Sequence, residues 1–376
     1  MKILLVFGTR PEAIKLAPLV SKLMQVKGIE VSVCVTAQHR QMLDQVLDLF
    51  KIKPDYDLDI MRDGQGLGYV TATVLTRLKR VLEESRPNWV IVQGDTSTTF
   101  AAALAAFYER IKVAHVEAGL RTGNVEAPWP EEINRVLTTR LASLHFAPTE
   151  EARENLVKEG VYSDRIEVTG NTVIDALFQT VAHIETNKEL QHSLSKRFPF
   201  LEDLNRGRRL ILATGHRREN FHGGLERVCR ALEQLAARDD VIIVYPVHLN
   251  PAVRESVNRV LHGRANVYLL PPQDYLPFVY LMRRAYFIIS DSGGIQEEAP
   301  SIGKPVLVTR DTTERPEAVA AGTVALVGTD VNAIVAKATE LLDEAKAYEA
   351  MSIARNPYGD GQASDRIVKR LLREGL

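Results

Sequence analysis

Three short segments in the first half of the sequence place an acidic side chain at the end of an apolar run or in a turn. They contain Asp95 in QGDT, Glu117 in HVEAG and Glu131 in PWPEE. Carboxylates in such positions suit proton transfer, although Asp95 or Glu131 taken alone also suits an ordinary helix cap. His115 and Glu117 point to one face of an alternating strand, but no further ligand follows at a recognisable spacing. We therefore predict an acid/base cluster and no metal site.

A basic cluster follows the first apolar run of the chain. Gly8, Arg10 and Lys15 stand within about one turn of an expected helix start, and this combination suits a phosphate. The two cations also fit ordinary surface charge. Neither the dinucleotide pattern GxGxxG nor the Walker A pattern occurs, which disfavours a nicotinamide dehydrogenase and a nucleoside triphosphatase.

Two segments of the second half are suited to a diphosphate. In TGHRREN, His216 lies beside two arginines, so its proton is disfavoured unless an anion binds nearby. In SDSGGIQEE, Ser292, Gly293 and Gly294 open an expected helix with free N–H groups. One turn later Glu298 can accept both hydroxyls of a ribose. The glycines also fit a plain strand-to-helix turn, but the adjacent acids favour a nucleotide.

Neighbouring segments offer further groups to the same ligand. Arg315 in TRDTTERPE is a candidate charge partner, and Gln273 in PPQDYLPF can hydrogen-bond a base. Phe278 in the same segment can stack on a base, or it can simply pack in the core. These residues together predict a nucleotide site in the second half of the chain.

The elements that must position these groups are alternating short apolar runs and longer segments of helical period, which indicate an α/β fold with parallel sheets. Strands are expected in the first half near 2–7, 31–36, 89–93, 113–116 and 145–147, and in the second half near 210–213, 241–244, 267–270, 287–289, 306–308 and 324–327. Ligands of open α/β sheets bind outside the carboxyl ends of the strands. The candidate residues follow those ends.

The length of 376 residues exceeds what one hydrophobic core usually supports, so two domains are expected. The strand pattern is lost between 185 and 209, which predicts domains at 1–170 and 171–360. A helical segment at 361–376 is expected to return to the first domain. Together with the nucleotide site predicted above, this organisation predicts an enzyme that binds a nucleotide-containing ligand in a cleft between two domains.

The charge balance excludes several classes of partner. With 47 basic and 48 acidic residues, the chain has no broad basic field for nucleic acid or for an anionic membrane. Cys34 and Cys229 lie in separate apolar segments without metal-binding spacing, as expected of core residues in a reducing compartment. The apolar run at 3–7 is too short for a membrane span, so a cytoplasmic location is expected.

Several motifs together resemble the non-hydrolysing UDP-N-acetylglucosamine 2-epimerases. The resemblance covers nearly the whole chain and follows the family's order: GTRPE (8–12), QGD (93–95), VEAGLR (116–121), PEEINR (130–135), GHRREN (215–220) and SDSGG (290–294). It implies a GT-B fold, in which two Rossmann-like domains face a central cleft. It also implies a homodimer that interconverts UDP-GlcNAc and UDP-ManNAc without a cofactor and supplies N-acetylmannosamine for bacterial surface polysaccharide.

The resemblance also assigns roles to matching positions of this sequence. It implies that the residues nearest the reacting sugar are Asp95, Glu117, Glu131 and His216. It implies that the nucleotide is bound by Arg10, Lys15, Gln273, Phe278, Ser292, Gly293, Gly294, Glu298 and Arg315. In some members UDP-GlcNAc also binds as an activator beside the active site, and the matching segment QHRQ gives Gln38 and Gln41 as candidates. Gly64 stands near where some members carry an arginine, so the activator contact stays open.

The implied reaction begins with loss of UDP, because the C2 proton of the sugar is not beside a carbonyl. Departure of the diphosphate gives C1 oxocarbenium character, and a carboxylate then removes the C2 proton to form 2-acetamidoglucal. Return of the proton to the other face and re-addition of UDP complete the inversion. A glycosyltransferase, a hydrolysing relative and a catalytically silent nucleotide-sugar sensor remain as alternatives. Three carboxylates favour proton transfer over the first and the last.

Overall fold

The chain forms two compact units in the computed structural model, which describes residues 1–37, 40–62, 64–215, 217 and 223–375. Unit 1 contains Met1–Gln179 and Tyr358–Leu376, and unit 2 contains Thr180–Pro357. The sequence pattern placed these divisions after residues 170 and 360. The first division lies inside a helix, where a sequence pattern gives no boundary signal.

Unit 1 is built on a seven-stranded parallel sheet with the order β3-β2-β1-β4-β5-β6-β7. Its strands are β1 Lys2–Phe7, β2 Glu30–Val35, β3 Tyr56–Asp57, β4 Trp89–Gln93, β5 Lys112–Val116, β6 Leu144–Ala147 and β7 Ile166–Val168. The five strands expected in this half are confirmed. The edge strands β3 and β7 were not predicted, because two or three residues are too few to show an alternation.

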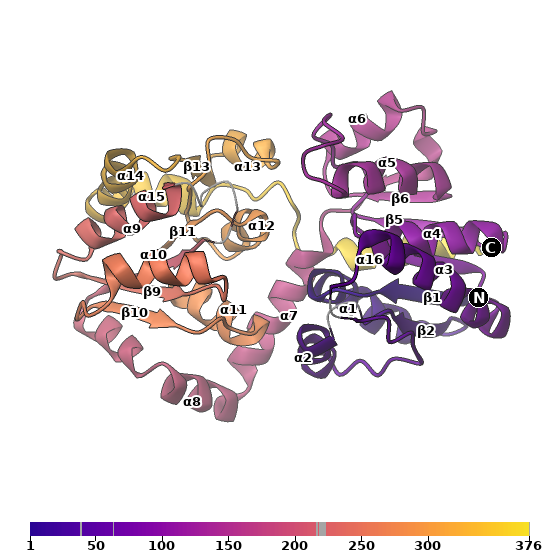
Figure 1. Cartoon of the computed structure of the whole chain (residues 1–376), viewed down its shortest axis with the longest axis horizontal. Helices are drawn as coiled ribbons and strands as arrows, with labels where there is room; N and C mark the ends of the chain where they lie inside the picture. Colours follow the sequence, from indigo (N-terminus) through magenta and orange to yellow (C-terminus); the bar gives the residue numbers. More distant parts are fainter. Residues whose placement is uncertain (38–39, 63, 216, 218–222, 376) are drawn as a thin grey trace. The chain divides into compact units, whose positions relative to one another are not determined.

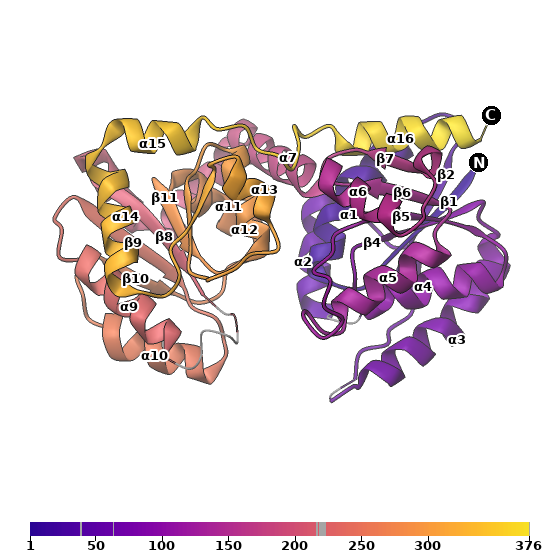
Figure 2. The ribbon, with the colours of Figure 1, turned by 90° about the horizontal axis from the view of Figure 1, so that it is seen from above.

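Helices cover both faces of this sheet (Figures 1 and 2). They are α1 Arg10–Met24, α2 Arg40–Phe50, α3 Leu67–Ser85, α4 Ser97–Tyr108, α5 Glu131–Leu141, α6 Glu150–Lys158 and α16 Ala363–Glu374, with the short 3₁₀ helix η1 Ser163–Arg165. Helix α7 Thr172–Thr186 begins in unit 1 and ends in unit 2. The C-terminal α16 packs on α1, where Lys22 Nζ donates to Asp365 Oδ2 at 3.1 Å. The two ends of the chain therefore belong to one unit.

Unit 2 repeats the architecture with a six-stranded parallel sheet in the order β10-β9-β8-β11-β12-β13. Its strands are β8 Arg209–Thr214, β9 Val241–Pro246, β10 Val267–Leu270, β11 Phe287–Ser290, β12 Val306–Val308 and β13 Val324–Leu326. Its helices are α8 Lys188–Arg197, η2 Pro199–Arg206, α9 Gly224–Leu235, α10 Pro251–Leu261, α11 Tyr275–Arg284, α12 Gly293–Ser301, α13 Pro316–Ala320, α14 Val331–Asp343 and α15 Ala345–Ser352. All six strands expected in this half are confirmed.

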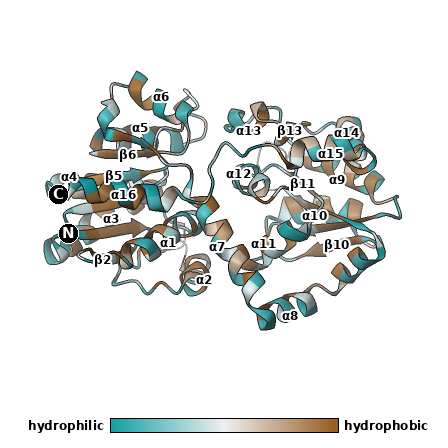
Figure 3. Cartoon of the chain, turned by 180° about the vertical axis from the view of Figure 1, so that it is seen from behind, coloured by the Kyte–Doolittle hydropathy of each residue, from teal (hydrophilic) through white to brown (hydrophobic). Residues whose placement is uncertain are grey.

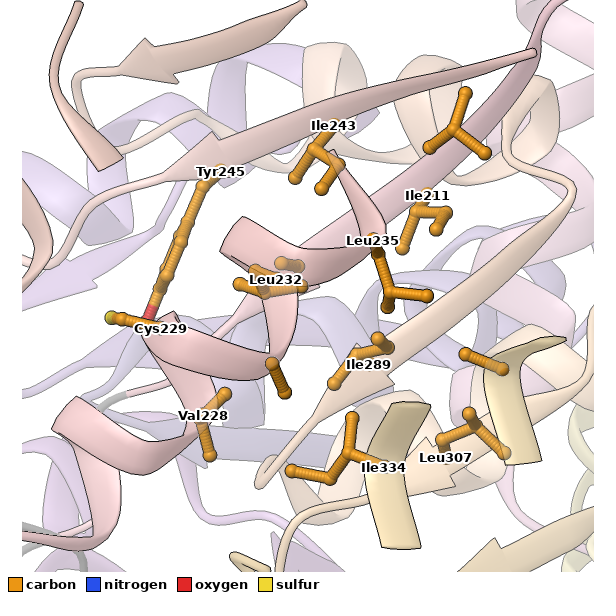
Figure 4. Packing of buried hydrophobic residues seen from close by; sticks show 14 of the residues in the cluster. Ile211, Val228, Cys229, Leu232, Leu235, Ile243, Tyr245, Ile289, Leu307 and Ile334 are labelled. Carbon is orange, nitrogen blue, oxygen red and sulfur yellow. The ribbon is translucent and has the colours of Figure 1, made fainter. Parts of the chain in front are cut away.

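The cores explain why the strands read as apolar runs. The strands are largely hydrophobic in Figure 3, because helices shield a parallel sheet on both faces. In unit 2, Ile211 and Ile289 of the sheet pack with Leu232 of α9 (Figure 4). Both cysteines are free and buried, as expected of core residues. Within the described residues, no helix combines the length and apolarity needed to cross a membrane.

Each sheet reverses its strand order at one place, and this reversal positions the candidate residues. In unit 1 the order turns between β1 and β4, and in unit 2 between β8 and β11. Ligands of open α/β sheets bind outside the carboxyl ends of the strands at such a point. The motif GTRPE follows β1 and QGD ends β4, whereas the GHRREN segment follows β8 and SDSGG ends β11. The predicted α/β class with two Rossmann-like units is confirmed.

The segment after β5 is tightly packed around Gly119. Its φ is +94°, and an added Cβ would overlap the Ala152 carbonyl oxygen and lie 2.9 Å from Leu156 Cγ. Gly160 has a similar φ of +85° but open space around it, so it is the matched control. We expect Gly119→Ala to lower the unfolding free energy of unit 1 by about 3 kcal/mol or more, from backbone strain plus overlap. Gly160→Ala should cost about 1 kcal/mol. Equal losses in urea denaturation would contradict the packing argument.

Candidate functional site

Glu12 ties together the two loops at the switch point of unit 1. Its Oε2 accepts from the Gly8 and Thr9 backbone N–H groups at 3.0 and 2.7 Å. Its Oε1 accepts from the hydroxyls of Thr96 and Thr99 at 2.6 and 3.1 Å. Burial raises the pKa of Glu12, and these donors oppose the rise. No role was predicted for Glu12, although Thr9 followed three residues later by an acid is a capping-box pattern.

Arg10 is the first residue of α1, next to this buried network, and its side chain is half-buried. Pro11 has no N–H, and the N–H groups of Gly8 and Thr9 already donate to Glu12, so the Arg10 guanidinium is the group at this helix start that favours an anion. The role of Arg10 in binding a phosphate stays a prediction.

Glu117 is held by donors from three separate segments. Lys15 Nζ lies 2.7 Å from Oε1 and 2.6 Å from Oε2, Gln93 Nε2 donates to Oε2, and Asn171 Nδ2 donates to Oε1 at 3.3 Å. The residue is 7% exposed and has a φ of +62°, a left-handed conformation that costs roughly 1–2 kcal/mol. Such a conformation persists only where the surroundings fix it, and it is typical of functional positions.

Lys15 therefore lies closer to Glu117, the candidate acid/base residue, than the sequence indicated. It was expected to bind the nucleotide, and in this structure its ammonium pairs with the Glu117 carboxylate. Gln93 and Asn171 were given no role from the sequence. A strand-end glutamine carries no special signal, and Asn171 is 54 positions from Glu117 in the chain.

Asp95 is paired with an arginine and does not cap a helix. Arg135 Nε and Nη2 both donate to its Oδ2, at 3.0 and 2.7 Å, and Asn134 donates to its main-chain carbonyl at 2.9 Å. Thr96 is the residue that caps α4, by accepting from Thr99 N. The Asp95 side chain is about a quarter exposed. It is therefore an oriented carboxylate that a ligand can still reach.

The two adjacent acids of PWPEE have different surroundings. Glu131 begins α5 and is half-buried. Glu132 is buried and accepts from Thr122 N and Gly123 N, both at 3.1 Å, and from Arg135 Nη1 at 3.0 Å. Burial lowers the pKa of Arg135, but the carboxylates of Asp95 and Glu132 outweigh that effect and raise it. Glu132 is thus part of the framework that orients Asp95, and the sequence did not single it out.

His115 is buried inside the sheet. Its Nε2 lies 2.7 Å from the Gly94 carbonyl oxygen, and burial lowers its pKa to about 4. The neighbouring His145 on β6 has a pKa lowered to about 3, again chiefly by burial. Both rings are neutral at pH 7. Across the described residues, no group of three or more His, Cys, Asp and Glu side chains is arranged to hold a metal ion.

The switch point of unit 2 places two arginines at the start of α12. A Cβ added to Gly293 would lie 3.4 Å from Arg315 Cζ and 3.7 Å from Arg217 Nη2. Arg315 is oriented by Glu297, whose Oε1 accepts from Nε at 2.8 Å and whose side chain is 1% exposed. Arg217 was not assigned a role in GHRREN. Its main-chain N–H donates to Asp291 Oδ2 at 2.9 Å. A helix N-terminus flanked by two guanidinium groups favours a doubly charged anion.

Ser292 and Gly294 complete this turn. Ser292 is the N-cap of α12, and its N–H donates to Ser290 Oγ at 3.0 Å. Gly294 is the second residue of the helix, and Glu298 lies one turn further, where its Oε2 accepts from the Tyr275 hydroxyl at 2.8 Å. The helix start and the acid expected for a diphosphate and a ribose thus lie on one short helix.

Gln273 and Phe278 lie at the start of α11. Gln273 Oε1 accepts from Arg197 Nη2 at 2.7 Å, while its Nε2 donates to the Pro271 carbonyl oxygen at 2.6 Å. Phe278 is half-buried, so part of its ring is accessible. Arg197 of α8 was not predicted to take part, because it belongs to the polar stretch that showed no strand pattern.

Three predicted residues fall outside this description. Gln38 and His216 are not among the described residues, and neither is the side chain of Gln41. The remaining predicted residues divide between the two switch points. Unit 1 contains Arg10, Lys15, Asp95, Glu117 and Glu131, and unit 2 contains Gln273, Phe278, Ser292, Gly293, Gly294, Glu298 and Arg315.

Comparison with known proteins gives a consistent result. A family model described as UDP-N-acetylglucosamine 2-epimerase matches residues 21–372. The chain is 61% identical to the UDP-N-acetylglucosamine 2-epimerase of Yersinia pestis and covers 98% of it with 99% of its own length. The corresponding Escherichia coli K12 enzyme is 59% identical over the same shares of the two chains.

A solved structure agrees with these relatives. The crystal structure of UDP-GlcNAc 2-epimerase from Neisseria meningitidis bound to UDP-GlcNAc matches with a TM-score of 0.93 and 52% identity. The match covers 99% of this chain and 100% of that one. The resemblance carried by the motifs is confirmed: this chain belongs to the UDP-N-acetylglucosamine 2-epimerase family.

Proposed function

We propose that this UDP-N-acetylglucosamine 2-epimerase, an isomerase, interconverts UDP-GlcNAc and UDP-ManNAc by elimination and re-addition of UDP, without a cofactor. The observation that carries the proposal is the Glu117 carboxylate. It is buried, held in a left-handed main-chain conformation, and fixed by Lys15, Gln93 and Asn171. An acid that is so constrained suits proton transfer to and from a carbon atom.

The nucleotide binds residues of unit 2 in this proposal. The diphosphate takes the start of α12, where Gly293 lies beside the guanidinium groups of Arg315 and Arg217. Glu298 accepts the ribose hydroxyls, and Gln273 and Phe278 hold the base. Arg10 and His216 add positive charge or hydrogen bonds at the leaving group. Each charge-assisted hydrogen bond contributes about 1.5–3 kcal/mol, and such contacts matter most when the diphosphate carries its full charge.

Elimination breaks the bond between C1 and the diphosphate oxygen and forms the C1–C2 double bond of 2-acetamidoglucal. The C2 proton leaves to a carboxylate as C1 gains oxocarbenium character. The Lys15 ammonium donates to both oxygens of the Glu117 carboxylate in this structure. We therefore infer that Lys15 controls when Glu117 accepts a proton. Re-addition of UDP follows return of a proton to the opposite face of C2.

Inversion requires acid/base groups on both faces of the sugar. Asp95, Glu117 and Glu131 are the candidates, and their surroundings differ. Asp95 is paired with Arg135, Glu117 with Lys15, and Glu131 is half-buried at a helix start. Carboxylates in different surroundings can hold different protonation states. The reaction requires this, because a base must act on one face of C2 and an acid on the other.

Three wider features of the proposal follow from the family resemblance. We propose that the enzyme is a homodimer, that it works in the cytoplasm, and that its product supplies N-acetylmannosamine for surface polysaccharide. Activation by UDP-GlcNAc through Gln38 and Gln41 is a separate proposal. A sigmoidal dependence of rate on UDP-GlcNAc concentration would support it, and hyperbolic kinetics would oppose it.

Deuterium incorporation tests the reaction itself. The purified protein is incubated with UDP-GlcNAc in deuterated water, without added metal or nicotinamide, and followed by proton NMR. We expect UDP-ManNAc with deuterium at C2, because the group that protonates the opposite face of C2 has exchanged its own proton with solvent. Retention of hydrogen at C2 in the product would contradict the proton-transfer mechanism. Accumulation of free UDP and free N-acetylmannosamine would instead indicate hydrolysis.

Replacement of Glu117 tests the acid/base assignment. Glu117→Gln keeps the size of the side chain but removes the proton-accepting carboxylate, so we expect epimerisation to fall by roughly 10²–10⁴-fold. UDP affinity, measured by calorimetry, should change by less than about twofold, because the proposal places the nucleotide on other residues. Glu154→Gln, on the exposed surface of α6, is the matched control and should be fully active. Full activity in Glu117→Gln would refute the assignment.

Replacement of Arg315 tests the diphosphate site. Arg315→Gln removes a guanidinium beside Gly293, so we expect the Kd for UDP to rise by roughly 10–100-fold. The Kd for uridine, which has no phosphate, should change little. Arg254→Gln, on the exposed face of α10, is the control and should leave both affinities unchanged. An equal loss for uridine and UDP would mean that Arg315 acts on the fold of unit 2 and not on the diphosphate.

A further inference from the structure

Two segments connect the compact units, and they meet in unit 1. One runs through α7, which begins at Thr172, and the other joins unit 1 at Tyr358. Asn171 N donates to the Tyr358 carbonyl oxygen at 2.7 Å. Gly170 and Gly359, both with positive φ, are packed so closely that a Cβ on Gly170 would lie 3.3 Å from Gly359 Cα. The two segments are therefore in direct main-chain contact.

The first turn of α7 is also attached to the C-terminal helix. Asp175 accepts from Ser364 N at 2.8 Å and from Ala363 N at 3.2 Å, at the start of α16. Asp175 is buried, and burial raises its pKa against the effect of these donors. These bonds hold the beginning of α7 in one place within unit 1.

Asn171 connects these segments to Glu117, because it bonds to both. The residue is 2% exposed, and its side-chain amide uses both ends. Oδ1 accepts from Val173 N at 3.2 Å, in the manner of a helix cap, and Nδ2 donates to Glu117 Oε1 at 3.3 Å. An asparagine can do both at once, whereas serine or aspartate can cap the helix but cannot donate to the carboxylate at this distance.

We propose that Asn171 is a positioning residue, which orients the Glu117 carboxylate and ties it to the two segments that connect the units. A change of main-chain torsion in either segment then moves the amide that holds the carboxylate. The inference rests on the proposed acid/base role of Glu117. The titratable groups facing Glu117 include Lys15 from α1 and His115 from β5, and His115 is neutral above about pH 4.

Two substitutions of Asn171 that keep the helix cap isolate its contact with Glu117. Asn171→Ser keeps an acceptor for Val173 N and loses the donor to Glu117, while Asn171→Asp places a second carboxylate there. Loss of the donor in either variant, and the added negative charge in Asn171→Asp, disfavour the charged form of Glu117. We expect the acid limb of kcat/KM to move to higher pH in the order wild type, Asn171→Ser, Asn171→Asp, by about one pH unit for the last. We expect kcat to fall more than tenfold in Asn171→Asp, with KM within about twofold of wild type, because the orientation of Glu117 affects the chemical step.

Asn187 provides the matched control. It caps α8 in unit 2 by accepting from Leu190 N at 3.0 Å, so Asn187→Ser and Asn187→Asp repeat the capping change away from Glu117. Neither should move the pH profile. A rise in KM alone, or an equal drop in thermal stability and activity in both series, would overturn the positioning role.

A readout that does not need turnover separates this inference from the proposed function. The Glu117 carboxyl carbon, labelled with ¹³C and identified by its loss in Glu117→Gln, can be titrated by NMR in the full chain. The midpoint should rise in the same order across the Asn171 series. Unchanged midpoints would refute the inference even if the enzyme epimerises. Shifted midpoints in a chain that fails to epimerise would leave Asn171 in place and refute the proposed function.

Discussion

A carboxylate removed from water must be surrounded by donors, and this requirement shapes the edge of the first sheet. Glu12 and Glu117 are almost completely buried, and each accepts hydrogen bonds from several segments. Every donor fixes the segment that carries it, because an unpaired buried charge costs several kcal/mol. The loops after β1 and β4 and the start of α7 are therefore placed by the charges they enclose. The groups proposed for proton transfer are preorganised as a result.

The switch point of the second unit has a different electrostatic requirement. In the proposal this switch point binds an anion, and two guanidinium groups at one helix start repel each other. Glu297 removes part of that cost, because its buried carboxylate orients Arg315 beside Gly293 without occupying the start of α12. Arg217 reaches the same glycine from the loop after β8. This arrangement of two guanidinium groups at a helix start is what the proposed diphosphate site requires.

The two units share an architecture, and the proposal gives them different roles. Both are parallel sheets with one reversal of strand order, and both use that reversal to bring two loops together. In the proposal the first unit supplies acids that act on the sugar, and the second supplies cations and a helix start for the nucleotide. The contacts of Asn171 with Glu117, Val173 and Tyr358 connect the acid/base group of the first unit with the segments that lead to the second.

The sequence alone determined the strands, the α/β class and the candidate residues at the strand ends, because local periodicity and local motifs encode these features. It also indicated the family, through motifs that appear in a fixed order. The short edge strands β3 and β7 were not predictable from so few residues. Nor were the pairing of Lys15 with Glu117, of Arg135 with Asp95, and the bond from Asn171. Those contacts join residues 40 to 102 positions apart, so only the packed sheet and its helices decided them.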